Sequence, residues 1–212
     1  MNDDNKTRLA TRIVLHNVRL GYADQLIVPK SYEENQPLRF SCTILLPPDH
    51  PGVGQIEAAL EAAATARWGR KADWPRPLKG INKDPCVKDV ADYPRIGITE
   101  PGWCFARANS LDPPGIVDAN VAELNKADLR REIYSGRWVT VSVNAFAYER
   151  ETGAGVSLGL GNIQLLKHDA RLGVARPSAA DEFDPEALPA AGNDDLEEAP
   201  RQPARRPARQ RS

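Results

Sequence analysis

The chain has 212 residues, of which 41% are hydrophobic and 27% charged, and its formal net charge is −1. This length can bury one good hydrophobic core or at most two small ones, and apart from its 18 prolines the composition is that of an ordinary soluble globular protein. No apolar run approaches membrane-spanning length and the polar N-terminus shows no signal or transit peptide, so we expect a cytoplasmic protein.

The cysteines and histidines show no metal-binding pattern. Cys42, Cys86 and Cys104 are odd in number and lack the paired spacing of zinc ligands, which favours reduced thiols in a cytoplasm. The three histidines are isolated in the sequence, as is more typical of structural or surface residues than of metal ligands. We therefore expect no metal and no cofactor.

The charges are divided unevenly along the chain. Residues 175–212, called the tail below, are rich in alanine, proline and acids and end in arginines, so we expect them to be disordered. The tail holds six of the 28 basic and eight of the 29 acidic residues, which leaves 22 and 21 in the body. Because the body is not strongly basic, binding to nucleic acid depends on where its charges lie. Residues 1–10 are expected to be flexible, so the predicted domain is 11–174.

The first predicted elements are two strands and a helix. Residues 11–21 are apolar enough for a strand, and residues 38–46 alternate between two faces until a pair of prolines ends the run. Residues 53–68 carry apolar side chains at helical spacing, and the following glycine suits the C-terminal cap. Arg67, Arg70 and Lys71 at the helix end are either a solvated cap, which the helix dipole favours, or part of a phosphate-binding rim.

Residues 71–101 are a long, proline-rich connection with several basic side chains. Connections of this length are uncommon in compact domains and are often functional or disordered. The next predicted strand, residues 103–109, places small residues on its core face. Its other face carries Trp103, Phe105, Arg107 and Asn109.

A turn and a short helix capped by Asn125 lead into a predicted β-hairpin over residues 134–166. Alternate valines and alanines of its first strand can only face the core, and its second strand places glycines on the outer face. The outer face of the first strand carries Trp138, Asn144, Phe146 and Tyr148, with Arg137 just before it.

Two interpretations of these ring-bearing outer faces remain open. Aromatic rings beside side-chain-free backbone can form a shelf for nucleobases. Alternatively, the rings cover a second small core under a loop or helix, which is the interpretation that the hairpin alone favours. The recurrence of rings with basic and amide groups on two separate strands favours the shelf.

Three groups of segments form an ordered set along the chain. They are residues 105–110 (FARANS) followed by 114–118 (PGIVD), residues 133–136 (IYSG) with 143–146 (VNAF), and residues 155–164 (GVSLGLGNIQ) with 178–183 (SAADEF) downstream. As a set they resemble a family of tailed-phage and prophage single-stranded-DNA-binding proteins, long classified as a domain of unknown function. The resemblance covers residues 12–184.

This resemblance implies an oligonucleotide-binding (OB) barrel of five strands, which presents one strand face and two loops to the nucleic acid. We therefore predict a mainly β fold with one main helix, a long irregular insertion and a disordered C-terminal tail. The predicted helix follows the second strand, whereas the usual OB order places it after the third. Either a strand is hidden in residues 22–29, or residues 71–101 elaborate the fold. The arginine-rich end of the tail also departs from the family's usual acidic ending.

The leading hypothesis is sequence-tolerant binding of single-stranded DNA in phage replication or recombination, without chemistry, in the host cytoplasm. Aromatic rings would stack on bases, basic groups would meet phosphates, and amides would bond to sugars or base edges. The stacking candidates are Trp103, Phe105, Trp138, Phe146 and Tyr148; the phosphate candidates are Arg39, Lys79, Arg107 and Arg137; the amides are Asn109 and Asn144.

The rival hypothesis is an OB-type protein-interaction module whose aromatic face is covered by a partner or by a second copy. An enzyme is less favoured, because the sequence contains no phosphate-cradling glycine loop, metal set or nucleophile elbow. The tail has three candidate roles: its acids occupy the basic groove or dock onto replication proteins, its arginines add non-specific affinity, or it only aids solubility.

Overall fold

The computed structural model describes residues 9–31, 34 and 36–173. The tail and residues 1–8 lie outside these described residues, so their predicted disorder stays a prediction. The chain divides into two units, residues 1–175 and 176–212, and all described residues belong to the first. Among the described helices, none is both long and apolar enough to cross a bilayer.

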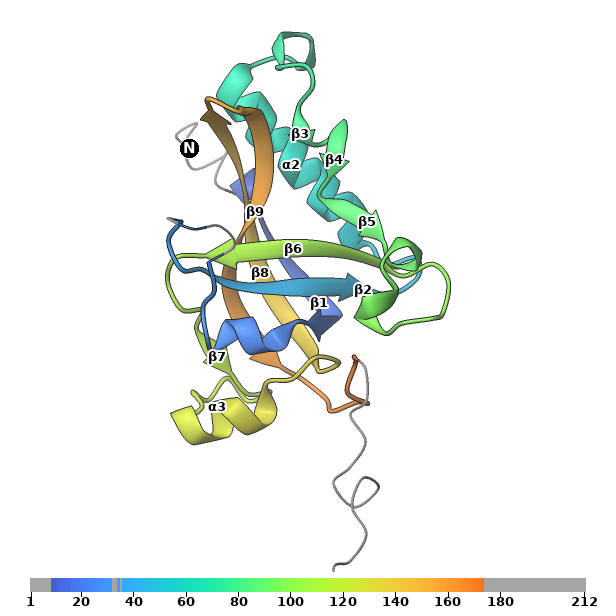
Figure 1. The fold of residues 1–212 in the computed structure, drawn as a ribbon, viewed down its shortest axis with the longest axis vertical. Coiled ribbons are helices and arrows are strands. Elements are labelled where there is room, and N and C mark those ends of the chain that lie inside the picture. Colours follow the sequence, from blue (N-terminus) through green and yellow to red (C-terminus); the bar gives the residue numbers. More distant parts are fainter. Residues whose placement is uncertain (1–8, 32–33, 35, 174–212) are drawn as a thin grey trace, which may run out of the picture. The chain divides into compact units, whose positions relative to one another are not determined.

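Five strands form a closed barrel, and they confirm the predicted OB-like architecture. They are β1 (Arg12–Gly21), β2 (Phe40–Leu46), β6 (Cys104–Ser110), β8 (Trp138–Arg150) and β9 (Gly153–Leu165). Their order around the barrel is β9-β8-β1-β2-β6, and a parallel pairing of β6 with β9 closes the ring (Figure 1). The predicted hairpin is therefore the β8–β9 pair, which is the longest in the barrel.

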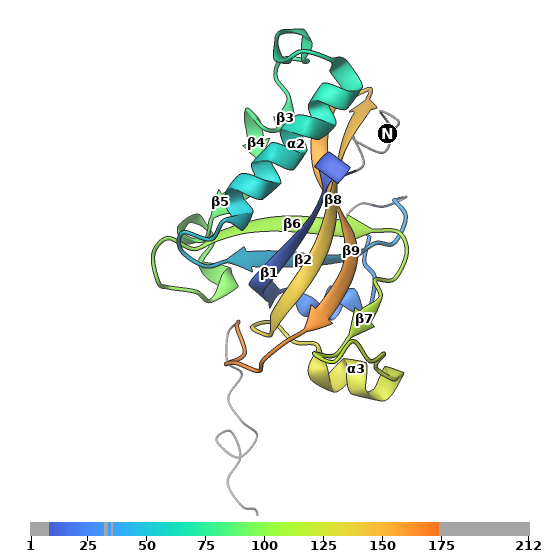
Figure 2. The ribbon, with the colours of Figure 1, turned by 180° about the vertical axis from the view of Figure 1, so that it is seen from behind.

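The barrel interior is filled by the apolar face that strand alternation predicts. Leu15, Ile44, Ala106, Val141 and Leu158 are each fully buried. Alternate side chains point to opposite faces of a strand, so the same strands carry a second, outward set. The helix α2 (Gly52–Trp68) packs its buried stripe, which includes Ile56 and Leu60, against the barrel (Figure 2).

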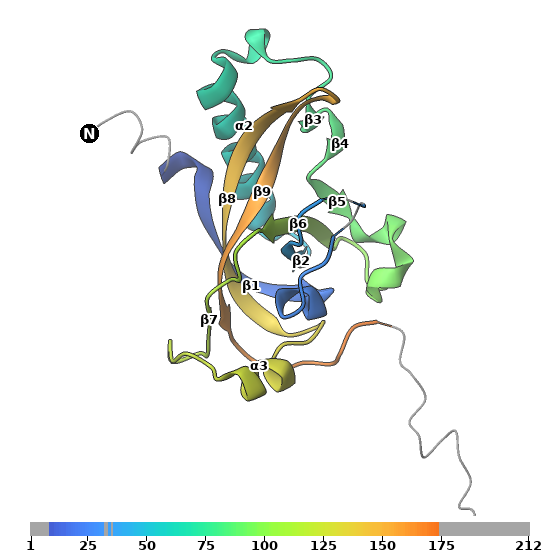
Figure 3. The ribbon, with the colours of Figure 1, turned by 60° about the vertical axis from the view of Figure 1, so that its left-hand side comes forward.

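The main helix, α2, follows the second barrel strand because residues 71–101 elaborate the OB fold, and not because a strand is hidden before it. Residues Ala23–Leu26 form a 3₁₀ helix, and no strand occurs among the described residues of 22–29. The insertion after α2 instead contributes three short strands, β3 (Lys79–Gly80), β4 (Lys83–Pro85) and β5 (Val87–Asp89). β3 pairs with β9 and β5 pairs with β6, so the insertion flanks the barrel on two strands (Figure 3).

The connection between β6 and β8 contains the short strand β7 (Ile116–Val117) and the helix α3 (Lys126–Glu132). The predicted cap is confirmed, because the Asn125 side-chain oxygen accepts from the backbone N–H groups of Ala127 and Asp128. α3 occupies the stretch in which the usual OB order places its helix, while α2 is the larger helix and lies one connection earlier.

A second, smaller core lies on the outside of β2 and β6. Leu45 and Phe105 are paired across these strands, and Val90, Ile96 and Ile98 of the insertion cover them. Phe105 is only 2% exposed, and the Tyr93 ring meets it edge-on at 4.8 Å between ring centres. The prediction that Phe105 stacks on nucleobases is therefore wrong; for this ring, the alternative of a second small core is correct.

Candidate nucleic-acid interface

One outward face runs continuously across four barrel strands. Thr43 pairs with Arg107 and Ser41 pairs with Asn109 across β2 and β6. Asn109 is in register with Gly159 of β9, beyond which lies Phe146 of β8. The predicted outward residues of β6 and the hairpin therefore meet through the β6–β9 pairing, which closes the barrel.

This face is hollowed into a groove, called the β2–β6 groove below. Its first part, a hollow of about 560 Å³, lies where the β1–β2 connection meets β2 and β6. Its middle part lies between the insertion and β6, and its last part reaches the β8–β9 turn. Lys79 lines all three parts, Arg107 joins the first to the middle, and Tyr148 joins the middle to the last.

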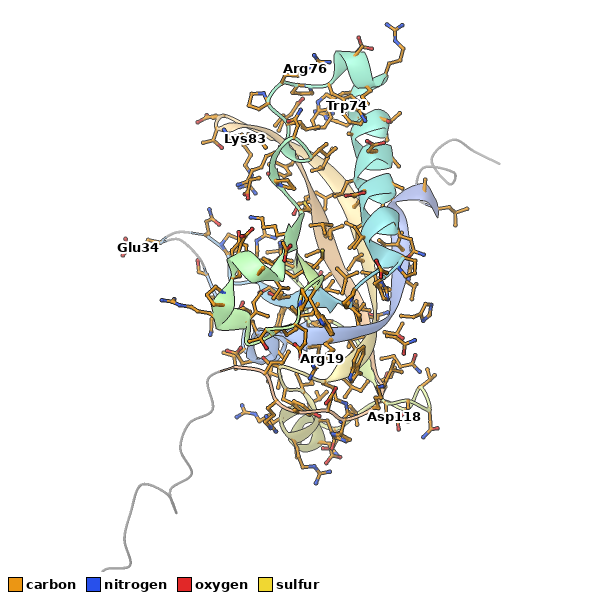
Figure 4. The ribbon with its side chains drawn as sticks, turned by 90° about the vertical axis from the view of Figure 1, so that its right-hand side faces the viewer. Arg19, Glu34, Trp74, Arg76, Lys83 and Asp118 are labelled. Atoms are coloured by element: carbon orange, nitrogen blue, oxygen red, sulfur yellow. The ribbon has the colours of Figure 1, made fainter. Side chains whose placement is uncertain are left out.

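The groove is strongly cationic, although the body as a whole is close to neutral. Among the described residues that line it, the only acidic side chain is Asp84. The basic lining residues are Arg76, Lys79, Lys83, Lys88, Arg107 and Arg150. Of these six, only Lys88 forms an ion pair with a described residue, Asp84. Figure 4 shows Arg76 and Lys83 near the same end of this unit.

Asp84 and Lys88 neutralise one another at the edge of the groove. The hydrogen bond from Lys88 lowers the pKa of the Asp84 carboxyl, and the same bond raises the pKa of Lys88. Two cysteines that line the groove add no charge, because burial raises the pKa of Cys42 to about 12 and that of Cys86 to about 11. All three cysteines are free thiols, as expected.

Two rings of β8 border the groove or lie beside it. Tyr148 lines the groove, and the Phe146 ring, whose residue is 38% exposed, lies 6.3 Å from the Tyr148 ring centre to centre. The Arg150 guanidinium lies 5.2 Å from the centre of the Tyr148 ring, so a cation is held beside the ring. Asn144 is exposed two positions before Phe146 and accepts a hydrogen bond from Thr11 at 3.2 Å.

Gly155, on the outer face of β9, makes room for the Tyr148 ring. A Cβ at Gly155 would lie within 2.5 Å of the Tyr148 ring, whereas one at Gly159 would lie 3.8 Å from the Phe146 ring, which is ordinary van der Waals contact. Glycine inside a strand often marks the close approach of another group, and at Gly155 that group is the Tyr148 side chain of the neighbouring strand.

The amide and arginine candidates on β6 and before β2 are brought together. Arg39 donates from Nη1 to Asn109 Oδ1 at 3.1 Å. Asn109 and Arg107 line the first part of the groove, so the pairing holds Arg39 at its border.

Comparison with known proteins identifies the family of this chain. Residues 11–196 match the model of a family described as the single-stranded-DNA-binding protein of Enterobacter phage Enc34. The chain belongs to the Enc34 family. No curated protein matches the chain.

Solved structures share the fold of this Enc34-family chain. The single-stranded-DNA-binding protein from bacteriophage Enc34, in complex with single-stranded DNA, is 23% identical, with a TM-score of 0.60 over 76% of this chain and 89% of that chain. A C-terminal truncation of that protein is 24% identical, with a TM-score of 0.60 over 76% of this chain and 88% of that chain. Gp2.5, a single-stranded-DNA-binding protein encoded by bacteriophage T7, is 16% identical, with a TM-score of 0.51 over 82% of this chain and 98% of that chain.

Three other predicted residues of this Enc34-family chain lie apart from the groove. Trp103 and Trp138 face each other at 6.3 Å between ring centres, near the start of β8. Arg19 and Lys167 lie over the Trp138 ring at 5.6 and 4.7 Å, and the indole N–H donates to Asp169 at 2.6 Å. That hydrogen bond lowers the pKa of Asp169. The third residue is Arg137.

The prediction that Arg137 meets phosphates is wrong. Arg137 is 6% exposed, and its guanidinium donates to Glu132 Oε2 at 3.1 Å and to the carbonyl of Leu166 at 3.0 Å. The side chains of β8 alternate between the core and the outer face as predicted. Arg137, just before the strand, is instead buried against α3 and the residues after β9. Its charge is therefore used inside the protein.

The arginine and lysine cluster at the end of α2 is exposed and pairs with acidic side chains, which favours the interpretation as a solvated cap. Arg67 pairs with Glu149 at 2.8 Å, Lys71 pairs with Glu61 at 2.7 Å, and Arg70 pairs with Asp73 at 3.3 Å. Glu149 also accepts from the Trp68 indole at 2.6 Å, so Trp68 anchors the helix end to the end of β8.

Sequence reasoning missed several groove residues of this Enc34-family chain. They are Tyr22, Gln25, Ser41, Thr43, Arg76, Lys83, Lys88 and Arg150. The basic residues in the unusually long insertion were the available signal, because long connections are often functional. Among the described residues, no three of the His, Cys, Asp and Glu side chains gather where a metal ion could bind.

Proposed function

We propose that this protein binds single-stranded DNA along the β2–β6 groove, in a sequence-tolerant manner and without a catalytic step. In this proposal it protects single strands during phage replication or recombination in the host cytoplasm. The observation that carries the proposal is the charge of the groove: of the described residues that line it, six are basic and one is acidic.

The position of the groove supports a polynucleotide ligand. OB folds bind oligonucleotides on the face of their second and third strands, between the loops that follow the first and fourth strands. In this barrel those elements are β2 and β6, the β1–β2 connection and the β8–β9 turn. Tyr22 and Gln25 of the connection lie at one end of the groove, and Arg150 and Thr152 lie at the other.

The chemistry of the lining supports a single strand. Cations spaced along a groove follow a phosphate backbone, and exposed rings stack on unpaired bases without regard to sequence. Arg76, Lys83 and Arg150 would meet phosphates near the turn, while Phe146 and Tyr148 offer the rings. Trp103 and Trp138 are left out of the proposed site, because they lie apart and cations cover the Trp138 ring.

The test is a fluorescence-anisotropy titration with labelled oligonucleotides of about 16 nucleotides. Tyr148→Ala combined with Phe146→Ala should weaken binding at least tenfold, since each stacked base contributes about 1–3 kcal/mol. Trp138→Phe is the control and should leave the affinity unchanged. The logarithm of the affinity should fall with the logarithm of salt concentration by about 0.7 per phosphate neutralised.

Two outcomes would overturn the proposal. If the intact protein shows no saturable binding at low salt, it does not bind single strands. If Trp138→Phe weakens binding while the ring variants do not, the site lies elsewhere. A stable dimer in light scattering together with indifference to oligonucleotides would favour the protein-interaction module.

A further inference from the structure

The first part of the β2–β6 groove differs from the rest in its chemistry. Arg107 and Lys79 supply its charge, and none of the described residues that line it is acidic. Its other polar side chains are amides and hydroxyls: Gln25, Ser41, Thr43 and Asn109, with the phenol of Tyr22. Amides and hydroxyls recognise the edges of bases, whereas phosphates are met mainly by cations.

Thr43 is a buried threonine that lines this hollow. The residue is 2% exposed, and its Cβ lies so near Gly21 that a Cβ added to this glycine would come within 3.3 Å of it. The Thr43 hydroxyl oxygen keeps some access to solvent, and it has no hydrogen-bond partner among the described residues. Buried polar groups in proteins are nearly always paired, with protein or with water. A ligand in the hollow would supply that partner.

The side-chain amide nitrogen of Asn109 is a hydrogen-bond donor at the border of the hollow. A guanidinium can only donate, so the atom that receives the 3.1 Å bond from Arg39 is Oδ1. The amide nitrogen is thereby turned away from Arg39, and it has no other partner among the described residues. Lys79 and Arg107 likewise carry donors and no acceptor.

Tyr22 supplies a ring at the border of the same hollow. The residue follows β1 directly, is 40% exposed, and adopts a left-handed conformation with φ of 51°. That conformation is uncommon for a residue with a large side chain. Here it places a ring beside the amides, where a base could stack.

We propose that this hollow holds one unstacked base of the bound strand and prefers thymine to adenine. The inference rests on the proposed function and adds base discrimination to it at a single position. Thymine offers two carbonyl oxygens to the donors of Asn109, Arg107 and Lys79, whereas adenine offers only ring nitrogens as acceptors and carries beside them an amino group that is itself a donor. The rest of the groove remains sequence-tolerant, so the preference of the whole protein is modest.

The test compares the affinities for oligo(dT) and oligo(dA) of about 16 nucleotides in four proteins. The intact protein should favour oligo(dT), and Asn109→Leu should reduce the dT/dA affinity ratio about three- to tenfold, as expected for one hydrogen bond. Because oligo(dA) stacks on itself equally in every titration, the change of the ratio between proteins isolates the contribution of the hollow.

Two further variants separate a base contact from general loss of binding. Thr43→Val keeps the shape of the side chain and should also reduce the ratio. Lys83→Ala, at the far end of the groove, should weaken both oligonucleotides equally and leave the ratio unchanged. Thermal unfolding of each variant checks that the barrel is intact.

The outcomes distinguish this inference from the proposed function. If the intact protein binds neither oligonucleotide, the proposed function fails. If it binds both and the ratio is the same in Asn109→Leu, Thr43→Val and the intact protein, the base-holding hollow is wrong and the proposed function stands. If Lys83→Ala changes the ratio as much as Asn109→Leu, the discrimination does not reside in the hollow.

Discussion

The Tyr148 ring is placed by the absence of a side chain on the neighbouring strand. Tyr148 pairs directly with Gly155, and the ring lies where the Cβ of any other residue would stand. In this position the ring lines both the middle and the last part of the β2–β6 groove. A glycine on β9 therefore controls the orientation of a stacking ring on β8.

We predict that Gly155→Ala weakens binding to single-stranded DNA several-fold with little loss of stability. The new methyl group would lie 2.4–3.0 Å from three atoms at the far end of the Tyr148 side chain, which can swing away from the groove. Anisotropy titration measures the effect. In a Tyr148→Ala background the same substitution should have no further effect on affinity, and an additive loss would contradict the mechanism.

At the scale of elements, α2 supports the barrel without entering the groove. Its buried stripe, which includes Ile56, Ala59, Leu60, Ala63 and Ala64, packs on the barrel core. No residue of α2 lines the groove. The helix end is tied to the end of β8 by Glu149, which accepts from both Arg67 and Trp68. Stability and binding should therefore be separable in this helix.

We predict that Ile56→Ala lowers the free energy of unfolding by about 2–5 kcal/mol, the usual range for truncating a fully buried large aliphatic side chain. Urea denaturation measures it, with the exposed neighbour Gln55→Ala as the control. At urea concentrations well below the unfolding midpoint of the variant, its affinity for oligonucleotides should equal that of the intact protein. A loss of affinity in a variant that is still fully folded would show that α2 shapes the groove.

At the scale of the whole molecule, the distribution of charge matters more than its total. A formal net charge of −1 gives no reason to expect binding to a polyanion. The fold nevertheless gathers basic side chains from the insertion, β6 and the end of β8, with one acid among the described residues of the groove. Cations in a groove raise the local concentration of a polyanion even where the rest of the surface is neutral.

We predict that Asp84→Asn tightens binding to single-stranded DNA about three- to tenfold at low salt, because it frees Lys88 for a phosphate. The salt dependence should steepen by about 0.7 in logarithmic slope. Asp128→Asn makes the same change of charge on α3, outside the groove, and should have a much smaller effect. If the two substitutions tighten binding equally, the gain in affinity comes from the change in net charge and not from the release of Lys88.

The pH dependence of this effect follows from the lowered pKa of Asp84. The carboxylate stays ionised down to below its ordinary value of 3.8, so the ion pair with Lys88 is intact between about pH 5 and 8. The advantage of Asp84→Asn should therefore be constant across that window. The contribution of the pair to stability is present above the ordinary pKa and is lost as the pH falls through the lowered one.

The amino-acid sequence by itself determined the strands, the main helix and the two-faced character of β6 and β8. Alternation and helical spacing are local properties, so Val141 and Ala106 could be assigned to the core and Arg107 and Tyr148 to the outer face without tertiary information. Only the tertiary structure decided which outward residues are open. Phe105 is covered because the insertion packs on it, and Arg137 is buried because Glu132 and the segment after β9 converge on it. Which residues share a groove depends on the β6–β9 pairing, a contact between distant parts of the chain that no local pattern encodes.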